Sequence, residues 1–309
     1  MNVIHRSSKM FQPENVLVVG AGYLGLRVAS RVAEIAKTAT YATTRSRRRF
    51  FELSEAGLVP LKFDWTDPQT FSSLPLGEVQ NVLVAVSFDR RSGVDRYSSQ
   101  VGGLVRLLRC LSPTTRVCYI STTGVYHQSD GRWVDETSPT RPKRLGGKVH
   151  LAAESRFHAL IPKQNWVVLR LAGIYGPGRI PRAADVIAGN PIRSSPDGFL
   201  NLIHVEDAVR ATLAAWEQMV RWGSSPPIGP QSRLFVVGDD RPSPRRMFYQ
   251  EIATLTGSEG PRFLPPGDQA PERSRSDSNK RVCNRKLKRL LLSDLHYPDY
   301  RSGLADILR

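Results

Sequence analysis

The feature that most constrains this chain is a glycine-rich turn between an apolar strand and an apolar helix. The run Asn15-Val-Leu-Val-Val-Gly20 leads into Gly20-Ala-Gly22-Tyr-Leu-Gly25, and apolar residues then recur at helical spacing from Leu26 to Ala36. Gly20 permits a tight turn, Gly22 lets the backbone approach a diphosphate, and Gly25 lets the helix pack against the strand. The helix N-terminus offers N–H groups to phosphate. This order predicts a dinucleotide-binding βα unit; the alternative is an ordinary glycine turn.

The end of the next expected strand, residues 38–43, is followed by arginines. A site that prefers NAD places Asp or Glu there to accept from the adenosine ribose. This chain has Thr44-Arg45-Ser46-Arg47-Arg48-Arg49 instead. Because guanidinium groups bind phosphate through paired hydrogen bonds, we expect NADP as the cofactor, with Arg45 as its main contact and NAD as the alternative. A solvated basic helix start would explain the same residues without a ligand.

Strand and helix patterns continue to alternate along the chain. Apolar runs at 58–63, 79–86, 115–121 and 166–172 are typical of strands, and 94–111 has a helical apolar face. Regular alternation with apolar strands predicts an α/β fold built on a doubly wound parallel sheet with helices on both faces. Ligands of such sheets bind beyond the carboxyl ends of the strands, so residues at those ends are candidate site residues.

Composition narrows the class of protein. Of the 309 residues, 40% are hydrophobic and 23% are charged, which is typical of a globular chain. No apolar run approaches the ~18 residues that span a bilayer, and the three cysteines are too few for a disulfide framework, so we expect a cytoplasmic protein. Cys110 and Cys118 are typical of core residues, and no zinc-ligand spacing occurs. We expect residues 1–13 to be a flexible start.

The net charge of +16 is the other unusual feature of the composition. Such an excess suits nucleic acid, a membrane surface or an anionic small ligand. The densest basic runs, at 45–49 and 281–289, contain no interleaved aromatic residues, and no helix-turn-helix pattern occurs. Nucleic-acid binding is therefore the weaker hypothesis, and we expect a small-molecule substrate and no membrane partner.

Several different short motifs are spread along nearly the whole chain. After the glycine turn they are Asp64-x-x-Asp67, Ile120-Ser-Thr-Thr-Gly-Val-Tyr126, Asp135-Glu-Thr-Ser-Pro139-x-x-Pro142, Leu169-Arg170-Leu-Ala-Gly-Ile-Tyr175-Gly-Pro-Gly178, Asn201-Leu-Ile-His204-Val-Glu-Asp207-Ala208, Ser278-Asn279-Lys280-Arg281 and Tyr297-Pro-Asp-Tyr300. In this order the motifs resemble the extended short-chain dehydrogenase/reductase superfamily, of the NAD-dependent epimerase/dehydratase type. Each motif is weak alone, and their order along one chain is specific.

The resemblance implies a Rossmann-like NAD(P)-binding domain at 14–178 and 200–237 and a smaller C-terminal substrate lobe at 179–199 and 238–309. The cofactor contacts that it implies are Gly20, Gly22, Tyr23, Leu24, Gly25, Thr44, Arg45, Asp64, Val86, Ser87 and Lys148. The implied substrate contacts are Thr123, Arg179, Arg182 and His204. The arginines would suit an anionic or sugar-like substrate, or would simply be solvated, and His204 would otherwise order its loop. A homodimer is expected by analogy only.

The chain departs from the family at the catalytic pair Tyr-x-x-x-Lys on the helix after the fifth strand. In the family this tyrosine exchanges a proton with the substrate during hydride transfer, and the lysine lowers its pKa. Counting back from Lys148 puts Arg144 at the tyrosine position. Anchoring the alignment on Glu154 instead puts Gly146 at the tyrosine position and His150 at the lysine position. The tyrosine is missing in either register.

No tyrosine occurs between Tyr126 and Tyr175, so a small shift of alignment cannot restore the pair. By resemblance Thr122 would hold the substrate oxygen, unless its hydroxyl only caps local backbone. Lys148, His150 or Tyr126 would then supply the proton.

Two hypotheses follow. One is an NADP-dependent oxidoreductase, or an epimerase or dehydratase relative, and the other is a catalytically silent NADP-binding protein that serves as a sensor or scaffold.

Overall fold

A seven-stranded parallel sheet dominates the computed structural model, which describes residues 14–161, 165–265 and 279–309. The strand order is β12-β7-β5-β4-β1-β2-β3, and every pairing is parallel. The strands are β1 (Val16–Val19), β2 (Thr40–Thr44), β3 (Val59–Lys62), β4 (Asn81–Val84), β5 (Arg116–Thr122), β7 (Trp166–Leu171) and β12 (Leu234–Val237). The doubly wound sheet predicted from the sequence is confirmed, and its order reverses beside β1, where such sheets bind ligands. The segment 1–13, expected to be flexible, lies outside the described residues.

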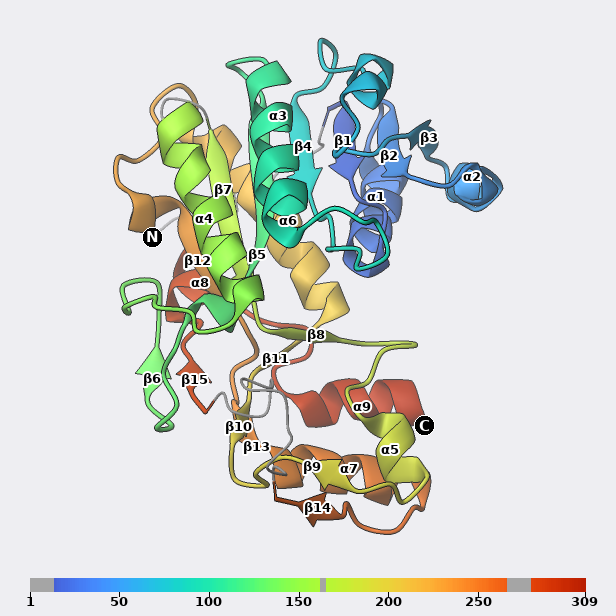
Figure 1. The fold of residues 1–309 in the computed structure, drawn as a ribbon, viewed down its shortest axis with the longest axis vertical. Helices are drawn as coiled ribbons and strands as arrows, with labels where there is room; N and C mark the ends of the chain where they lie inside the picture. The colour runs from blue at the N-terminus through green and yellow to red at the C-terminus, as the bar shows by residue number, and fades with distance from the viewer. Residues whose placement is uncertain (1–13, 162–164, 266–278) are drawn as a thin grey trace, which may run out of the picture.

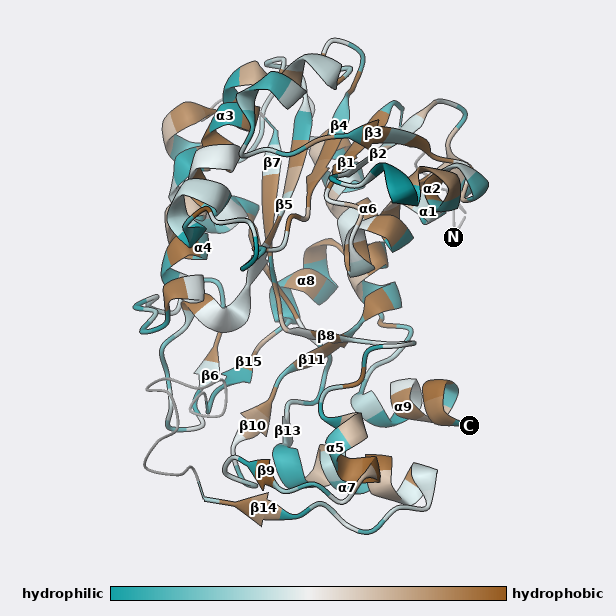
Figure 2. Cartoon of the chain, turned by 45° about the vertical axis from the view of Figure 1, so that its right-hand side comes forward, coloured by the Kyte–Doolittle hydropathy of each residue, from teal (hydrophilic) through white to brown (hydrophobic). Residues whose placement is uncertain are grey.

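Helices cover both faces of this sheet (Figure 1). Successive residues of β1 face opposite sides of the sheet: Val16 and Val18 pack in the apolar cluster of α1 (Tyr23–Ile35) and α6 (Val205–Trp222), whereas Leu17 and Val19 pack in that of α3 (Gly103–Cys110) and α4 (Leu145–Leu160). Figure 2 shows the resulting hydrophobic strands between the helical layers. The helices of these layers are α1 (Tyr23–Ile35), α6 (Val205–Trp222) and α8 (Arg285–Leu290) on one face, and α3 (Gly103–Cys110) and α4 (Leu145–Leu160) on the other. The short α2 (Phe50–Glu55) follows β2.

The helix expected over 94–111 is interrupted. It begins at 96, where the Asp95 carboxylate caps it by accepting from the backbone N–H groups of Tyr97 and Ser98. A π-helical stretch, Ser98–Gly102, then precedes α3. The Asp95 cap therefore fixes where the loop after β4 ends and the helix begins.

A smaller region lies beyond the carboxyl ends of the strands, in the lower half of Figure 1. It has its own apolar core, which includes Tyr175, Phe248, Ile252 and Leu304. Its elements are α5 (Ala183–Ile187), α7 (Arg245–Thr256), α9 (Tyr300–Leu308) and the strand pairs β8 (Gly173–Tyr175) with β11 (Leu202–His204), β9 (Ile192–Arg193) with β14 (Phe263–Leu264), β10 (Phe199–Leu200) with β13 (Ser243–Pro244), and β6 (Trp133–Val134) with β15 (Arg281–Val282). No helix in the described ranges is long and apolar enough to cross a membrane.

Candidate dinucleotide-binding site

The turn after β1 and the first turn of α1 each contain a position that accepts only glycine. Gly20 has a φ of +100°, and a Cβ there would lie 2.9 Å from the carbonyl oxygen of Ala85. A Cβ on Gly25 would collide with the carbonyl oxygen of Gly20, so this glycine lets α1 pack closely on the turn. A Cβ on Gly22, in contrast, would meet no atom within 4 Å. Gly22 therefore keeps open a space that a ligand can fill.

The first turn of α1 faces the same space. Gly22 is the N-cap of α1 and contributes no side-chain cap, so no side chain at this position accepts from the N–H groups of the first turn. Unsatisfied N–H groups and the helix dipole favour a negative charge at this end. The turn is therefore suited to a phosphate.

A groove of about 340 Å³ extends from this turn across the carboxyl ends of β1 to β4. Of the cofactor contacts expected from the sequence, it brings together Gly20, Gly22, Thr44, Arg45, Asp64, Val86 and Ser87. Its other lining residues are Ala21, Thr43, Ser46, Arg49, Phe63, Trp65, Thr66, Ala85, Asp89, Ser92 and Ser99. Residues far apart in the sequence thus form one elongated site beside the glycine turn.

The Arg45 side of the groove carries charged residues that the sequence did not single out. Arg45 pairs with Asp89, whose carboxylate also accepts from the backbone N–H of Arg91. This backbone hydrogen bond and the Arg45 guanidinium lower the pKa of Asp89. Arg49 donates to the carbonyl oxygen of Ala21, within the glycine turn, and pairs with Glu52. The sequence showed Arg49 only as part of a basic run, and it did not single out Asp89.

Asp64 shapes the loop after β3. Its Oδ1 accepts from the backbone N–H and the hydroxyl of Thr66, at 2.9 and 2.6 Å. Thr66 and Asp64 both line the groove. The carboxylate therefore holds the wall of the groove in place.

Tyr23 and Leu24 do not line the groove with their side chains. The Tyr23 ring lies under the guanidinium of Arg27, at 4.1 Å, and near that of Arg179, at 5.2 Å. Its hydroxyl donates to the carbonyl oxygen of Pro177, and Leu24 is buried in the core. Only the backbone N–H groups of Tyr23 and Leu24 remain as candidate phosphate contacts, because packing occupies both side chains.

The expected substrate arginines have different surroundings. Arg179 is exposed and lies against Tyr23, next to the glycine turn. Arg182 is exposed and pairs with Asp185, three residues along the chain in α5. Arg182 fits the solvated alternative, because its ion pair is local and exposed.

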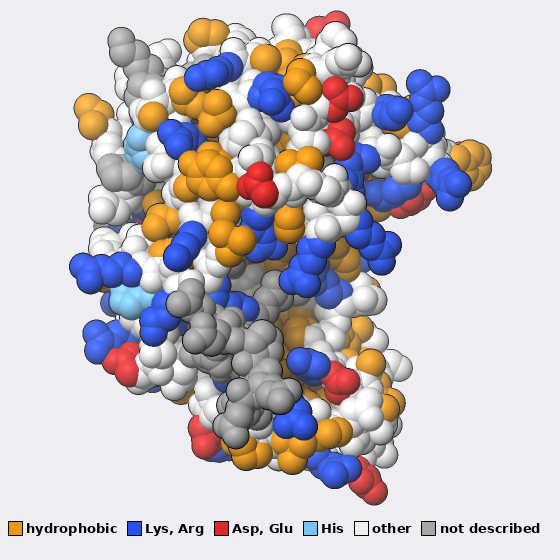
Figure 3. All heavy atoms as spheres, viewed as in Figure 1, with side chains coloured by type: hydrophobic (Ala, Val, Ile, Leu, Met, Phe, Trp, Pro, Cys, Tyr) orange, Lys and Arg blue, Asp and Glu red, His pale blue; other side chains and the backbone are white. Residues whose placement is uncertain are grey.

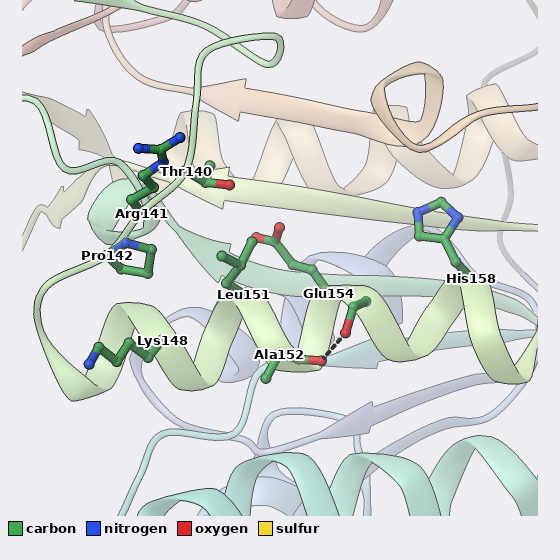
Figure 4. A pocket seen from close by; sticks show the side chains of 9 residues that line it. Thr140, Arg141, Pro142, Lys148, Leu151, Ala152, Glu154 and His158 are labelled. Carbon is green, nitrogen blue, oxygen red and sulfur yellow. Dashed lines mark hydrogen bonds between the residues drawn. The ribbon is translucent and has the colours of Figure 1, made fainter.

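Lys148 lies outside the groove, contrary to its expected role as a cofactor contact. It is exposed on the outer side of α4, where a second hollow of about 670 Å³ follows the helix surface. Figure 4 shows Lys148 at the N-terminal end of α4 and His158 further along the same helix. The helical period directs Lys148 to solvent, since its neighbours Gly147 and Val149 are buried.

Thr122 lies at the end of β5, and its hydroxyl accepts from the backbone N–H of Gly124 at 3.0 Å. This is the local capping contact of the 3-10 turn Thr123–Val125. The hydroxyl still carries a proton that can be donated, because a hydroxyl is both donor and acceptor. Thr123 is buried, with 8% of its surface exposed.

Tyr126 is a core residue, so the expectation that it supplies a proton is not supported by its surroundings. Its hydroxyl accepts from Arg170 at 2.9 Å, and burial raises its pKa. Arg170 also forms a buried ion pair with Glu154, which accepts from the hydroxyl of Ser121. This network joins β5, α4 and β7, and its members stabilise one another in a nonpolar environment.

The two candidate histidines are largely buried. Burial, reinforced by the charge of Arg96, lowers the pKa of His150 to about 4, and its Nδ1 is 2.9 Å from the hydroxyl of Tyr119. Burial also lowers the pKa of His204 to about 4. Its Nδ1 accepts from the backbone N–H of Glu206 and so caps α6. His204 therefore orders its loop, and both rings are neutral at pH 7. No group of three or more His, Cys, Asp or Glu residues in the described parts of the chain could hold a metal ion.

The chain is similar in sequence and structure to known proteins. The model of the NAD-dependent epimerase/dehydratase family matches residues 16–226. The protein YeeZ of Escherichia coli K12 is 31% identical over 186 residues, which span 60% of this chain and 59% of YeeZ. A functionally unknown conserved protein from Silicibacter pomeroyi is 30% identical, with a TM-score of 0.75 over 96% of this chain and all of that one.

A more distant structure shares the fold alone. The dTDP-glucose 4,6-dehydratase from Bacillus anthracis, solved in complex with NAD, is 16% identical, with a TM-score of 0.74 over 96% of this chain and 95% of that one. The seven-stranded parallel sheet and the smaller C-terminal region are therefore shared with solved structures of such enzymes. From the match to residues 16–226, the chain belongs to the NAD-dependent epimerase/dehydratase family.

Proposed function

We propose that this chain binds NADP(H) in the groove beside the glycine turn. The single observation that carries the proposal is the open space over Gly22, which caps the N-terminus of α1 and lines the same groove as Arg45. The diphosphate would lie on the first turn of α1, and the adenosine 2′-phosphate would lie beside Arg45. The Bacillus anthracis protein of the same fold was solved in complex with NAD, which supports a dinucleotide as the ligand.

The charge of the surface supports an anionic cofactor. Figure 3 shows Lys and Arg side chains gathered around α2 and along the molecule below it. Arg45 and Arg49 line the groove itself, and the net charge of the chain is +16. A positive surface raises the local concentration of an anionic ligand, and a guanidinium suits a phosphate better than a ribose hydroxyl.

We further propose that the chain is an oxidoreductase that acts on a hydroxyl or carbonyl group of a small substrate. Thr122 and the N-terminus of α4 lie at the carboxyl end of β5, next to the strand whose end lines the groove. A hydroxyl at this place can hydrogen-bond a substrate oxygen.

The second candidate function is a catalytically silent NADP-binding protein. The observation in its favour is that α4 contains no tyrosine, while Lys148 faces solvent and Tyr126 is buried. A positioned general acid contributes about 10²–10⁴-fold in rate, and its loss leaves the glycine turn intact. Cofactor binding without turnover would then serve sensing or scaffolding.

Cofactor binding is tested by calorimetric titration of the purified chain with NADPH and NADH. We expect NADPH to bind more tightly than NADH. Gly22→Val should weaken both by more than about tenfold, because its side chain fills the phosphate space. Gly77→Val is the matched control, since Gly77 also has open space around it and lies outside the groove. Equal binding by Gly22→Val and the wild type would refute the site.

The two candidate functions are separated by a substrate panel. NADPH oxidation is followed with aldehydes, ketones and nucleotide sugars. Turnover on any of them supports the oxidoreductase, whereas tight NADPH binding with no turnover across the panel supports the silent protein.

A further inference from the structure

The loop after β4 carries a guanidinium that none of the expected roles includes. Arg96 is the first residue of the helix that Asp95 caps, and it is partly buried. Its guanidinium carbon lies 4.6 Å from the centre of the Phe88 ring. Phe88 directly follows Ser87, which lines the groove. Arg96 therefore contacts the residue that directly follows the groove lining at the end of β4, and it does not itself line the groove.

The same guanidinium reaches the start of α4. A Cβ on Gly146 would lie 2.5 Å from Nη1 of Arg96, so a side chain at 146 would require the guanidinium to shift. Gly146 is also the position that alignment on Glu154 assigns to the missing tyrosine. The guanidinium of Arg96 therefore lies beside the position where that alignment puts the side chain of the family tyrosine.

The turn after β5 packs against the first turn of α4. Gly147 packs directly on the carbonyl oxygen of Gly124, and a Cβ on Gly124 would lie 3.3 Å from Oγ1 of Thr122. Arg96, the first turn of α4 and the Thr122 turn therefore pack against one another in sequence, Arg96 on Gly146 and Gly147 on Gly124. The N-terminus of α4 has no side-chain cap, and both its dipole and the guanidinium favour a negative charge there.

The orientation expected for the dinucleotide would bring its nicotinamide half toward Arg96 and Thr122; this step rests on the proposed function. The adenosine half would lie toward Arg45, at the end of β2. The other half must then extend from the glycine turn across β4 toward β5, because β4 and β5 follow β1 on the opposite side of the sheet from β2. The reactive end of the nucleotide would thus approach the place between Arg96 and Thr122.

We propose that Arg96 is a catalytic residue that binds the reacting oxygen of the substrate. In a carbonyl reduction, the carbonyl carbon receives a hydride from the bound reduced nucleotide and the electron pair of the C=O π bond moves to oxygen. Arg96 donates hydrogen bonds to this oxyanion, and a water molecule then supplies the proton. Arg96 keeps its own protons throughout, because a guanidinium does not deprotonate in proteins.

The test uses sulfite, a small anion that adds reversibly to C4 of oxidised nicotinamide and gives an adduct with its own near-ultraviolet absorbance. In the adduct the sulfur lone pair forms the new bond, the ring nitrogen loses its positive charge, and the sulfonate projects where a substrate oxygen would lie. Sulfite is titrated against the complex of the full chain with NADP⁺, and NADP⁺ affinity is measured separately by calorimetry.

We expect the wild-type complex to form the adduct at lower sulfite concentration than free NADP⁺. Arg96→Met should raise the sulfite dissociation constant about 10- to 100-fold, which is the range for hydrogen bonds to a charged group, and leave NADP⁺ affinity within about twofold. Arg96→Lys should retain part of the effect. Arg90→Met, an exposed arginine of the same loop, is the matched control and should match the wild type.

Gly146→Ala provides a second route if Arg96→Met does not fold. The added methyl group must displace the guanidinium, so sulfite affinity should fall while NADP⁺ affinity remains. The proposal is overturned if NADP⁺ binds and either the wild type gives no enhancement of the adduct or the folded Arg96 and Gly146 variants keep it. Absence of NADP⁺ binding in the wild type would instead overturn the proposed function itself, together with this inference.

Discussion

The guanidinium of Arg45 and the carboxylate of Asp89, which both line the groove, form an ion pair with Nη2 and Oδ2 2.7 Å apart. Arg45 follows β2 and Asp89 follows β4, so the pair joins two loops on either side of the glycine turn. Their side chains are 52% and 32% exposed, and exposed pairs are weak in water. A phosphate that enters the groove can therefore replace Asp89 as the partner of Arg45.

Removing the charge of Asp89 should strengthen NADPH binding. Asp89→Asn frees Arg45 and removes a negative charge that would lie near the 2′-phosphate. We expect about a two- to fivefold gain in NADPH affinity, in line with the energy of an exposed ion pair, and a smaller gain for NADH. Calorimetry checks this, with Asp130→Asn as the control because Asp130 pairs with Arg132 outside the groove. Weaker NADPH binding by Asp89→Asn would contradict the competition.

Removing Arg45 should affect NADPH more than NADH. Arg45→Met deletes the guanidinium that would bind the 2′-phosphate, and a hydrogen bond to a charged group contributes about 1.5–3 kcal/mol. NADPH affinity should fall roughly 10- to 100-fold, while NADH affinity stays nearly constant. Arg47→Met is the matched control, since Arg47 is exposed in the same run and does not line the groove. An equal loss for both nucleotides would rule out a specific phosphate contact.

The ion pair of Glu154 and Arg170 should be essential for stability. Its side chains are only 7% and 4% exposed. Glu154→Gln leaves the charge of Arg170 uncompensated in the core, which costs about 3–5 kcal/mol of unfolding free energy. Denaturant unfolding measures it, and Glu217→Gln is the control, because its exposed pair with Arg221 should contribute less than about 1 kcal/mol. Similar losses in the two variants would show that the buried pair has no special role.

Stability should depend on pH through the buried histidines. Burial lowers the pKa of both His150 and His204 to about 4, below the value of 6.5 for an unperturbed histidine. The unfolded chain therefore binds protons first as the pH falls, so their contribution is complete above pH 6.5 and is lost between pH 6.5 and 4. Urea unfolding at several pH values measures this fall, which should be shallower in His150→Gln. An unchanged slope in that variant would show that His150 is not held neutral.

Part of the site could be predicted from the sequence because its determinants are local. Gly20, Gly22 and Gly25 lie within six consecutive residues, and the packing of the turn against α1 depends on that spacing. Arg45 could be placed for a similar reason, since it directly follows β2 and parallel strands end at one edge of the sheet. The alternation of apolar strands and helices likewise predicts the layers, because each strand must be covered on both faces.

The rest depends on contacts between distant segments. Asp89 faces Arg45 only because the loops after β2 and β4 meet beside β1. Lys148 and Gly146 are two residues apart in α4. Residues at that spacing point to different faces of a helix, so Lys148 faces solvent while Gly146 lies against Arg96. The sequence alone thus determined a glycine turn, a basic residue beside it and a parallel sheet. Only the tertiary structure decided which charged groups face the groove, since pairing across loops depends on how the packed layers place the strand ends.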